Sequence, residues 1–313
     1  MSNKELSVVI GTGALGLAVM DELVAKGKDV RLVNRNGKAD VPSSVAVVKA
    51  DATDTAAIRE ACEGAAVIYH CAAPHYGSWK ELFPPLMQGI IDVAENVGAK
   101  LIYADNLYMY GLPKGKLSEE LPNAPISEKG KVRAQVADML LNASRNGKIK
   151  AAIGRGSDFF GERVKTSALG NQVFGAMLEN KPASVLGNID LPHTYTYIRD
   201  FAKGLVILSE HEEALGEVWH IPSDETITTR KIIEQIYAID DKEATFRIAP
   251  KLIVSIMAMF NKNMKDIKEM LYLYENPFVV EHNKFEKTFG MTATPRELAL
   301  KETIAWYKRE STT

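Results

Sequence analysis

The first half of the chain alternates short apolar runs with longer amphipathic stretches. The apolar runs predict strands at residues 6–10, 30–33, 45–48, 66–70, 100–104 and 149–154. Apolar positions at helical spacing predict helices at residues 15–25, 55–62, 86–97 and 131–144. Strands that alternate with helices are typical of a parallel sheet with crossover helices. We therefore expect an α/β fold, a doubly wound parallel sheet of the Rossmann type.

This rhythm changes near residue 155. Short strands and helices follow, with a turn-rich stretch at residues 181–192 and a helix that opens near Asp200. We expect a sheet domain over residues 1–155 and a smaller α+β lobe over 156–313, with chain exchange between the two allowed. No internal repeat or Ser/Gly linker is visible in the sequence, which favours two tightly packed parts.

Composition narrows the class of protein. Hydrophobic residues make up 46% of the chain and charged residues 25%, which is typical of a soluble globular protein. The 38 Lys and Arg residues nearly balance the 40 Asp and Glu residues, and no long block of like charge is present, so we expect no nucleic-acid partner. The two cysteines, Cys62 and Cys71, form no CxxC pair, so we expect neither a metal site nor a disulfide, and a cytoplasmic setting.

The longest apolar run spans residues 252–260, less than half of the ~20 residues that cross a bilayer. We expect a core or interface helix there, with peripheral membrane contact as the alternative. The N-terminus has no pattern of a signal peptide. These observations predict no integral membrane association.

A glycine motif joins the first predicted strand to the first predicted helix. It consists of Gly11, Thr12, Gly13, Ala14, Leu15 and Gly16. In a GxGxxG turn the first glycine permits the tight turn, the second lets backbone N–H groups approach a pyrophosphate, and the third lets the helix pack on the strand. The position of the motif in the first strand-helix turn favours dinucleotide binding over a glycine turn without a ligand.

The end of the second strand indicates which dinucleotide is preferred. Asn34 and Arg35 stand there, and no carboxylate precedes them to bind the ribose hydroxyls of NAD. A guanidinium can pair with a 2′-phosphate through two hydrogen bonds. These residues favour NADP, with NAD as the alternative. Arg35 can also be explained without a ligand, as a solvated loop residue.

Taken together, these motifs resemble the extended and atypical short-chain dehydrogenase/reductases, which include NAD-dependent epimerase/dehydratases. The resemblance also covers the stretches 103–111, 154–161 and 195–202. It implies further cofactor contacts from residues that follow the third and fourth strands, namely Asp51, Ala52, Cys71, Ala72 and Ala73.

The catalytic positions depart from the pattern of that family. Its members usually carry a serine, and then a tyrosine and a lysine four residues apart. By resemblance, Asn106 occupies the serine position, Lys129 the tyrosine position and Arg133 the lysine position. We therefore predict Asn106, Lys129 and Tyr108 as catalytic candidates, with Arg133 on the cofactor.

Residues of two loops and of the second lobe complete the expected site. The substrate-side candidates are His75, Tyr76, Asp158, Phe159, His193 and Tyr195. His193 stands where nucleotide-sugar enzymes of the family tend to have a phosphate-binding arginine. The acidic Asp158 also discourages a polyphosphate ligand.

These features lead to a main hypothesis with two alternatives. The main hypothesis is an atypical NAD(P)-dependent oxidoreductase or epimerase-like protein that transfers hydride on a small carbonyl or sugar-like substrate. The first alternative is a catalytically silent NADP(H) sensor or regulatory protein, and the second is a nucleotide-sugar epimerase or dehydratase. The sequence leaves a homodimer open.

Overall fold

A seven-stranded parallel sheet forms the centre of the molecule. The computed structural model describes residues 5–249 and 251–312. In chain order the strands are β1 (Leu6–Ile10), β2 (Asp29–Asn34), β3 (Ala46–Lys49), β4 (Ala65–His70), β5 (Lys100–Asp105), β6 (Ala151–Arg155) and β11 (Val218–His220). Their spatial order is β11-β6-β5-β4-β1-β2-β3, and every pair is parallel. This confirms the predicted doubly wound sheet.

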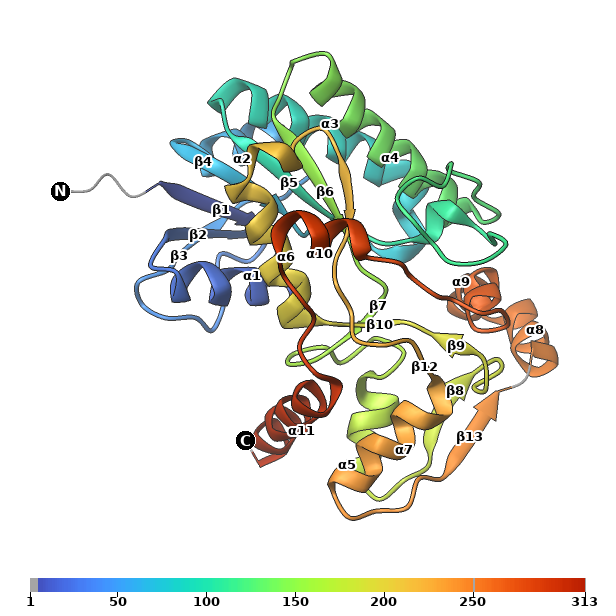
Figure 1. Cartoon of the computed structure of the whole chain (residues 1–313). Helices are drawn as coiled ribbons and strands as arrows, with labels where there is room; N and C mark the ends of the chain where they lie inside the picture. Colours follow the sequence, from blue (N-terminus) through green and yellow to red (C-terminus); the bar gives the residue numbers. More distant parts are fainter. Residues whose placement is uncertain (1–4, 250, 313) are drawn as a thin grey trace.

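Helices cover both faces of this sheet (Figure 1). One layer holds α1 (Ala14–Ala25) and α6 (Ile198–Glu210), and the other holds α2 (Thr55–Ala61), α3 (Trp79–Val97) and α4 (Glu128–Arg145). Successive residues of a strand pack against opposite helix layers, because their side chains point alternately to the two faces of the sheet. In β1, Val9 packs with α1 and α6, whereas Val8 packs with α2, α3 and α4.

Two helices begin three or more residues earlier than their sequence pattern predicts. The prediction started α3 at residue 86, after Pro84 and Pro85, but the helix begins at Trp79 and contains both prolines. Trp79 and Phe83 are buried in the core of that layer, so tertiary packing outweighs the local cost of the prolines. Helix α4 begins at Glu128 rather than at residue 131, with the Ser127 hydroxyl accepting the Gly130 N–H.

The second half of the chain forms a smaller lobe and also returns to the sheet. The lobe contains three two-stranded pairs: β7 (Asp158–Phe160) with β10 (Tyr195–Tyr197), β8 (Ala183–Leu186) with β13 (Phe246–Ala249), and β9 (Pro192–His193) with β12 (Ile227–Thr228). Its helices include α5 (Ala176–Leu178), α7 (Thr229–Ile239) and α11 (Arg296–Thr312). From this half, β11 forms the edge of the main sheet, with α10 (Asn283–Phe289) beside it.

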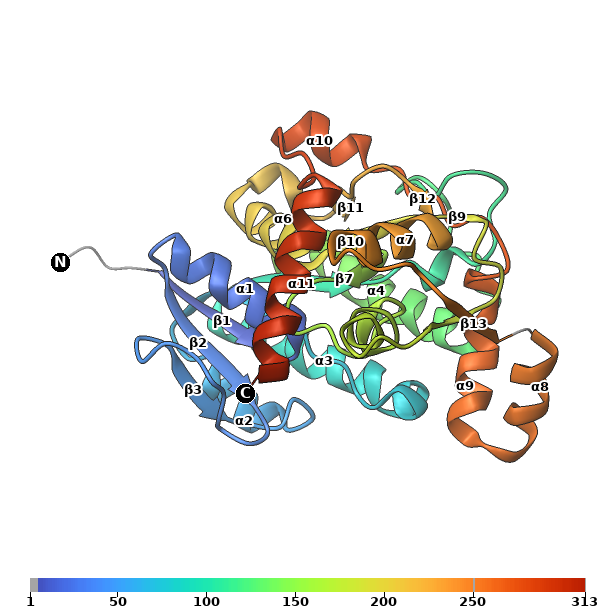
Figure 2. The ribbon, with the colours of Figure 1, turned by 90° about the horizontal axis from the view of Figure 1, so that it is seen from below.

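A helical hairpin projects from the side of the molecule (Figure 2). It consists of α8 (Lys251–Phe260) and α9 (Lys262–Met270) and contains the apolar run that we expected to form a core or interface helix. Val254 is buried, but Ile256 and Met259 are 51% and 77% exposed. Among the described residues, no helix has the length and apolar character to cross a membrane.

Candidate active site

The glycine motif forms an open cradle at the start of α1. Gly11 has a φ of 103°, and a Cβ there would lie 2.8 Å from the Ala72 nitrogen. A Cβ on Gly16 would lie 1.9 Å from the Gly11 oxygen. Both positions therefore require glycine, because a side chain at either would clash with neighbouring backbone atoms.

Gly13 differs, because a Cβ there would meet no protein atom within 4 Å. It is the N-cap of α1, and no side chain caps this helix end. The glycine keeps a space clear in front of the first backbone N–H groups, where the helix dipole favours an anion. The cradle thus fits the pyrophosphate of a dinucleotide.

Asn34 shapes the loop next to this cradle. Its Nδ2 donates to Thr12 Oγ1 at 3.0 Å and to the Lys38 carbonyl at 2.9 Å, while its Oδ1 accepts the N–H groups of Asn36 and Gly37. These bonds occupy both ends of the amide. The neighbouring Arg35 is exposed, so its guanidinium is the more accessible polar group at this strand end.

Asp51 lies near Arg35 on the same rim. Hydrogen bonds from the Thr53 backbone and hydroxyl, together with the charge of Arg35, hold the pKa of Asp51 below its usual value. Asp51 is therefore ionised and able to accept a hydrogen bond. Ala52 follows it, and Cys71, Ala72 and Ala73 pass behind the cradle after β4.

Arg133 is buried one turn into α4, and its Nε has no hydrogen-bond partner among the described residues. Its Nη1 donates to the Tyr103 hydroxyl at 2.6 Å and to Asp105 Oδ1 at 3.1 Å. Its guanidinium lies 4.4 Å from the centre of the Trp79 ring and 4.8 Å from that of Phe83. These partners hold a buried positive charge in a fixed position at the end of β5.

Lys129 stands at the beginning of the same helix and is bound to α9. Its Nζ donates to Asp266 Oδ1 and to Glu269 Oε2, each at 2.7 Å. The ammonium also lies 4.5 Å from the centre of the Tyr76 ring. Only 6% of the Lys129 side chain is exposed, so a substrate would have to compete with two carboxylates for this group.

Asn106 and Tyr108 follow β5 at the carboxyl edge of the sheet, where ligands bind in such folds. Asn106 Oδ1 accepts the Tyr108 N–H at 3.2 Å. The Tyr108 and Tyr76 side chains pack against the same buried cluster. Burial, and then the charge of Asp158, raise the pKa of Tyr108 above its usual value, so its hydroxyl stays protonated at neutral pH.

Asp158 faces this pair from the second lobe. Its Oδ2 accepts the Tyr274 hydroxyl at 2.9 Å and lies 3.1 Å from His193 Nε2. The His193 ring stacks on Tyr274 and Phe278, and Tyr195 packs beside it. The structure therefore brings together most of the predicted substrate-side residues.

Two predicted substrate residues lie differently. Phe159 points from β7 toward α6, where its ring meets Phe201 edge to face at 6.2 Å. His75 is exposed, and its Nδ1 accepts the Gly77 N–H at 3.4 Å at the start of the turn η1 (Tyr76–Ser78). Their roles toward a substrate stay predictions.

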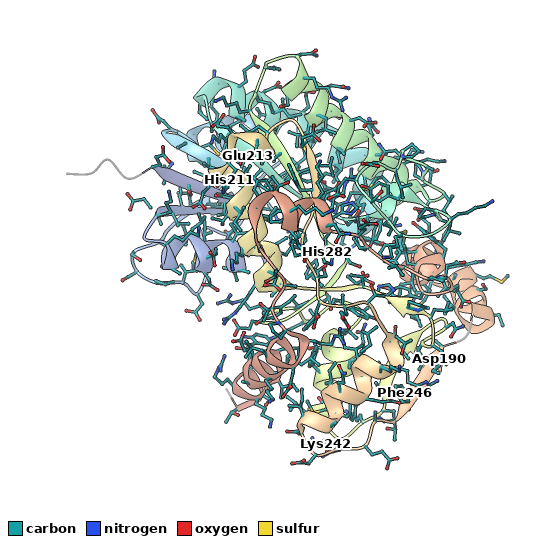
Figure 3. The ribbon with its side chains drawn as sticks, viewed as in Figure 1. Asp190, His211, Glu213, Lys242, Phe246 and His282 are labelled. Atoms are coloured by element: carbon teal, nitrogen blue, oxygen red, sulfur yellow. The ribbon has the colours of Figure 1, made fainter. Side chains whose placement is uncertain are left out.

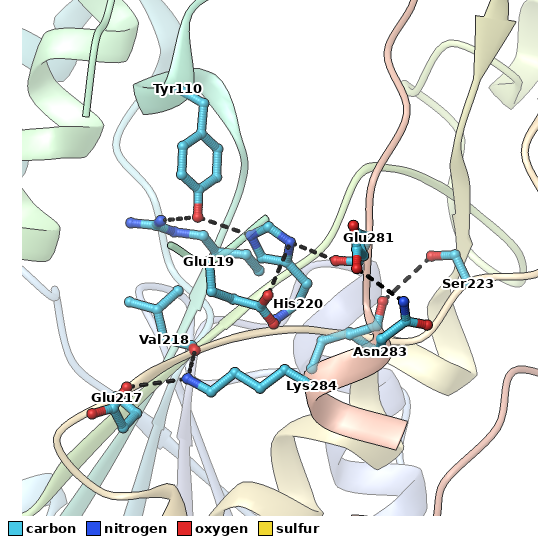
Figure 4. A network of polar contacts seen from close by, with 11 residues as sticks. Tyr110, Glu119, Glu217, Val218, His220, Ser223, Glu281, Asn283 and Lys284 are labelled. Atoms are coloured by element: carbon cyan, nitrogen blue, oxygen red, sulfur yellow. Dashed lines mark hydrogen bonds and ion pairs between the residues drawn. The ribbon is translucent and has the colours of Figure 1, made fainter. Parts of the chain in front are cut away.

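A buried polar chain supports the floor of the site (Figure 4). Arg155 donates to Asp105 at 3.2 Å and to the Tyr110 hydroxyl at 2.7 Å. Tyr110 Oη lies 2.8 Å from His220 Nε2, and His220 Nδ1 donates to the Glu281 carbonyl at 2.9 Å. Burial, with the Arg155 charge, lowers the pKa of His220 to about 3, so the ring is neutral and accepts the Tyr110 proton.

The sequence analysis missed the contribution of the region after residue 260. Asp266 and Glu269 on α9 bind Lys129, and Tyr274, just after the turn η5 (Leu271–Leu273), binds Asp158. Each lies more than a hundred residues from its partner. The charge alternation of α9 indicates a helix but does not identify what it binds.

The doubly wound sheet with a glycine cradle at its first crossover is typical of dinucleotide-binding proteins. Comparison of the chain with family models gives a match to the NAD dependent epimerase/dehydratase family over residues 8–221. The chain belongs to this family. The predicted family, the predicted fold and the prediction of an enzyme are thereby confirmed. The family is described as NAD dependent, so the preference for NADP stays a proposal.

Two curated relatives were found. An uncharacterized UDP-glucose epimerase, YtcB, of Bacillus subtilis is 24% identical over 208 residues, which cover 63% of this chain and 66% of that protein. The sterol-4-alpha-carboxylate 3-dehydrogenase (decarboxylating) of Mus musculus is 24% identical over 323 residues, covering 98% of this chain and 84% of that protein.

Solved structures share the fold. Epimerase Mth375 of Methanothermobacter thermautotrophicus superposes with a TM-score of 0.83 at 15% identity, covering 99% of this chain and 94% of that one. The UDP-glucuronic acid 4-epimerase of Bacillus cereus, in complex with UDP-glucuronic acid and NAD, has a TM-score of 0.79 at 20% identity, covering 97% and 99%.

Proposed function

We propose that this chain is an NADP-preferring oxidoreductase of its family that reduces a carbonyl group on a small molecule. The observation that carries the proposal is the placement of Asn106 and Tyr108 at the carboxyl edge of a sheet whose first crossover holds the open Gly13 cradle. Bound NADPH would supply the hydride. The residues of the chain then have to orient the carbonyl and provide a proton.

Tyr108 is the residue best suited to provide that proton. Its hydroxyl is protonated at neutral pH and can give its proton to the oxygen of a reduced carbonyl, but burial and the Asp158 charge raise its pKa and make it a weaker acid than a free phenol. Within the described residues the Asn106 Nδ2 has no hydrogen-bond partner, so it can donate to the same oxygen. Lys129 is less suited, because both Asp266 and Glu269 hold its ammonium.

Arg133 supports the proposal as a fixed cation at the end of β5. Its bonds to Asp105 and Tyr103 leave it little freedom to move a proton. We assign it the role of lining the cofactor side of the site. Asp51 and Arg35 on the opposite rim would bind the adenosine part, Arg35 through a 2′-phosphate.

A second candidate is the conversion of a nucleotide sugar. Similarity to a curated UDP-glucose epimerase favours it. The Asp158 carboxylate beside His193 disfavours it, because a diphosphate would meet a negative group in the second lobe.

The test is NADPH oxidation by the purified full chain with a panel of aldehydes, ketones and UDP-sugars, and with Tyr108→Phe. We expect turnover of a carbonyl substrate and a loss of about 10²- to 10⁴-fold in kcat for Tyr108→Phe, with unchanged NADPH affinity. The control is Tyr237→Phe, which removes a hydroxyl that bonds the Lys181 carbonyl elsewhere in the lobe.

Each other outcome has a definite meaning. A Tyr108→Phe variant that keeps kcat within tenfold overturns the assignment of the proton donor. Turnover of UDP-sugars alone supports the second candidate. Tight NADPH binding without turnover of any compound supports a catalytically silent sensor.

A further inference from the structure

We propose that Asp158, together with the four tyrosines around it, binds an organic ammonium group of the substrate. We call Tyr76, Tyr108, Tyr195 and Tyr274 the tyrosine cage. The proposal rests on the proposed function, because Tyr108 belongs to both sites. It specifies the substrate as a carbonyl compound that also carries an amine.

The geometry of Asp158 leaves one side of its carboxylate open. Tyr274 and His193 both contact Oδ2, at 2.9 and 3.1 Å. The other oxygen, Oδ1, has no hydrogen-bond partner among the side chains and backbone groups that the structure describes, and 19% of the side chain is exposed. A carboxylate in this state can accept a hydrogen bond from a ligand.

Tyr274 donates to Asp158, and Tyr195 packs on the His193 ring beside it. Tyr76, Tyr108 and Tyr274 pack against one buried cluster, which includes the Phe278 ring that stacks on His193. Burial is the main reason that the pKa values of the four tyrosines are raised, and the negative charge of Asp158 adds to the rise in each of them. Tyr76 and Tyr108 come from the sheet domain, whereas Tyr195 and Tyr274 come from the second half of the chain.

Aromatic rings around a carboxylate are suited to a cation. Ring faces attract ammonium groups through their quadrupoles, and a desolvated carboxylate adds a charged hydrogen bond. The Lys129 ammonium already uses the Tyr76 ring in this way, at 4.5 Å from its centre.

The cations near the cage are all bound to other carboxylates. Lys129 pairs with Asp266 and Glu269, while Arg133 and Arg155 share Asp105. Asp158 has no lysine or arginine partner in the described part of the chain, and its basic neighbour is His193. The surplus negative charge attracts an ammonium group and repels a diphosphate.

The experiment compares two probes of nearly equal shape, 2-phenylethylammonium and 2-phenylethanol. Their affinities are measured by calorimetry on the full chain loaded with NADPH, whose reduced nicotinamide ring carries no positive charge. We expect the ammonium probe to bind at least about tenfold more tightly than the alcohol.

Two variants test the residues separately. Asp158→Asn removes the charge but keeps an oxygen that can accept from Tyr274, and Tyr76→Leu removes one ring. Each should remove most of the preference for the ammonium probe. The matched control is Asp190→Asn, because Asp190 is an exposed carboxylate of the same lobe that pairs with Arg230 (Figure 3).

Equal affinity of the two probes for the wild-type chain overturns the proposal, as does an Asp158→Asn variant that keeps the preference. If Asp158→Asn does not fold, the wild-type preference and Tyr76→Leu decide. NADPH binding is measured first. Failure at that step counts against the proposed function, and the probes are then compared on the chain without NADPH.

Discussion

Lys129 contacts Glu269 twice: its backbone N–H donates to Oε1 at 3.0 Å and its ammonium to Oε2 at 2.7 Å. The carboxylate of α9 therefore caps the first turn of α4 and neutralises a buried charge at the same time. This pair joins the helical hairpin to the helix that carries Arg133. It makes Lys129 a residue that fixes the position of α9 beside Tyr76.

Lys129→Ala tests this role against that of a proton donor. The change leaves two partly buried carboxylates without their cation, so we expect the free energy of unfolding to fall by about 2–4 kcal/mol. Urea denaturation measures it. The control is Lys131→Ala, an exposed lysine that pairs with exposed Glu128 and should change stability by less than about 0.5 kcal/mol.

Kinetics then separate the two roles of Lys129. A positioning role predicts a raised KM with kcat changed by less than about tenfold, whereas an acid predicts a larger loss of kcat. A loss of kcat at unchanged stability would contradict our interpretation.

Gly13→Val should abolish dinucleotide binding in a folded protein. The new side chain would occupy the space that a pyrophosphate needs, but it would meet no protein atom at Cβ. Calorimetry with NADPH and thermal denaturation give the two readouts. Gly16→Val is the contrast, because its Cβ would overlap the Gly11 oxygen and the protein should fail to fold.

Arg35→Asp should reduce or reverse the preference for NADPH over NADH. A charged hydrogen bond contributes about 1.5–3 kcal/mol, so the wild-type ratio of dissociation constants should be about tenfold or more. Arg145→Asp, the same change at an exposed residue in the last turn of α4, serves as control. Equal dissociation constants in the wild type would refute the argument from Arg35.

Acid should destabilise the protein in part through His70. Its ring is fully buried, neither nitrogen has a hydrogen-bond partner in the described residues, and it stacks on Tyr103 at 5.1 Å. Burial, together with the Arg133 charge, lowers its pKa to about 3. Between pH 6.5 and 3 the unfolded state therefore binds more protons at this residue, so stability is present above pH 6.5 and is lost as the pH falls.

His70→Phe should remove this dependence. A phenyl ring keeps the stacking and does not titrate, so the loss of unfolding free energy from pH 7 to pH 5 should shrink by about 2 kcal/mol. Urea denaturation at the two pH values measures it. His211→Gln, at a histidine whose side chain is 41% exposed, is the control. An unchanged slope in His70→Phe would refute the assignment.

The sheet could be predicted from the sequence because its signals are local. All six predicted strands form. Five of them are largely buried, whereas β3 lies at the sheet edge with its ends exposed and Val47 and Val48 partly buried. The start of α3 could not be predicted, because burial of Trp79 and Phe83 decides it against the local preference of two prolines. The prediction did not include β11, whose pairing with β6 depends on residues far away in the chain.

The site divides in the same way. The glycine loop and Asn106 follow from motifs at strand ends, and they lie at the carboxyl edge of the sheet. The partners of Lys129 could not be derived, because nothing near residue 129 indicates that α9 lies beside it. The same holds for Tyr274 and Asp158, which only tertiary packing brings together.

The bond between Lys129 and α9 also has a consequence for synthesis on the ribosome. The sheet from β1 to β6 can begin to form once residue 155 has emerged, but the carboxylates for Lys129 and the Tyr274 hydroxyl come more than a hundred residues later. A nascent chain therefore holds the nucleotide cradle well before it can close the substrate side. A dinucleotide present during translation would meet the glycine loop before α9 and Tyr274 have completed the substrate side of the site.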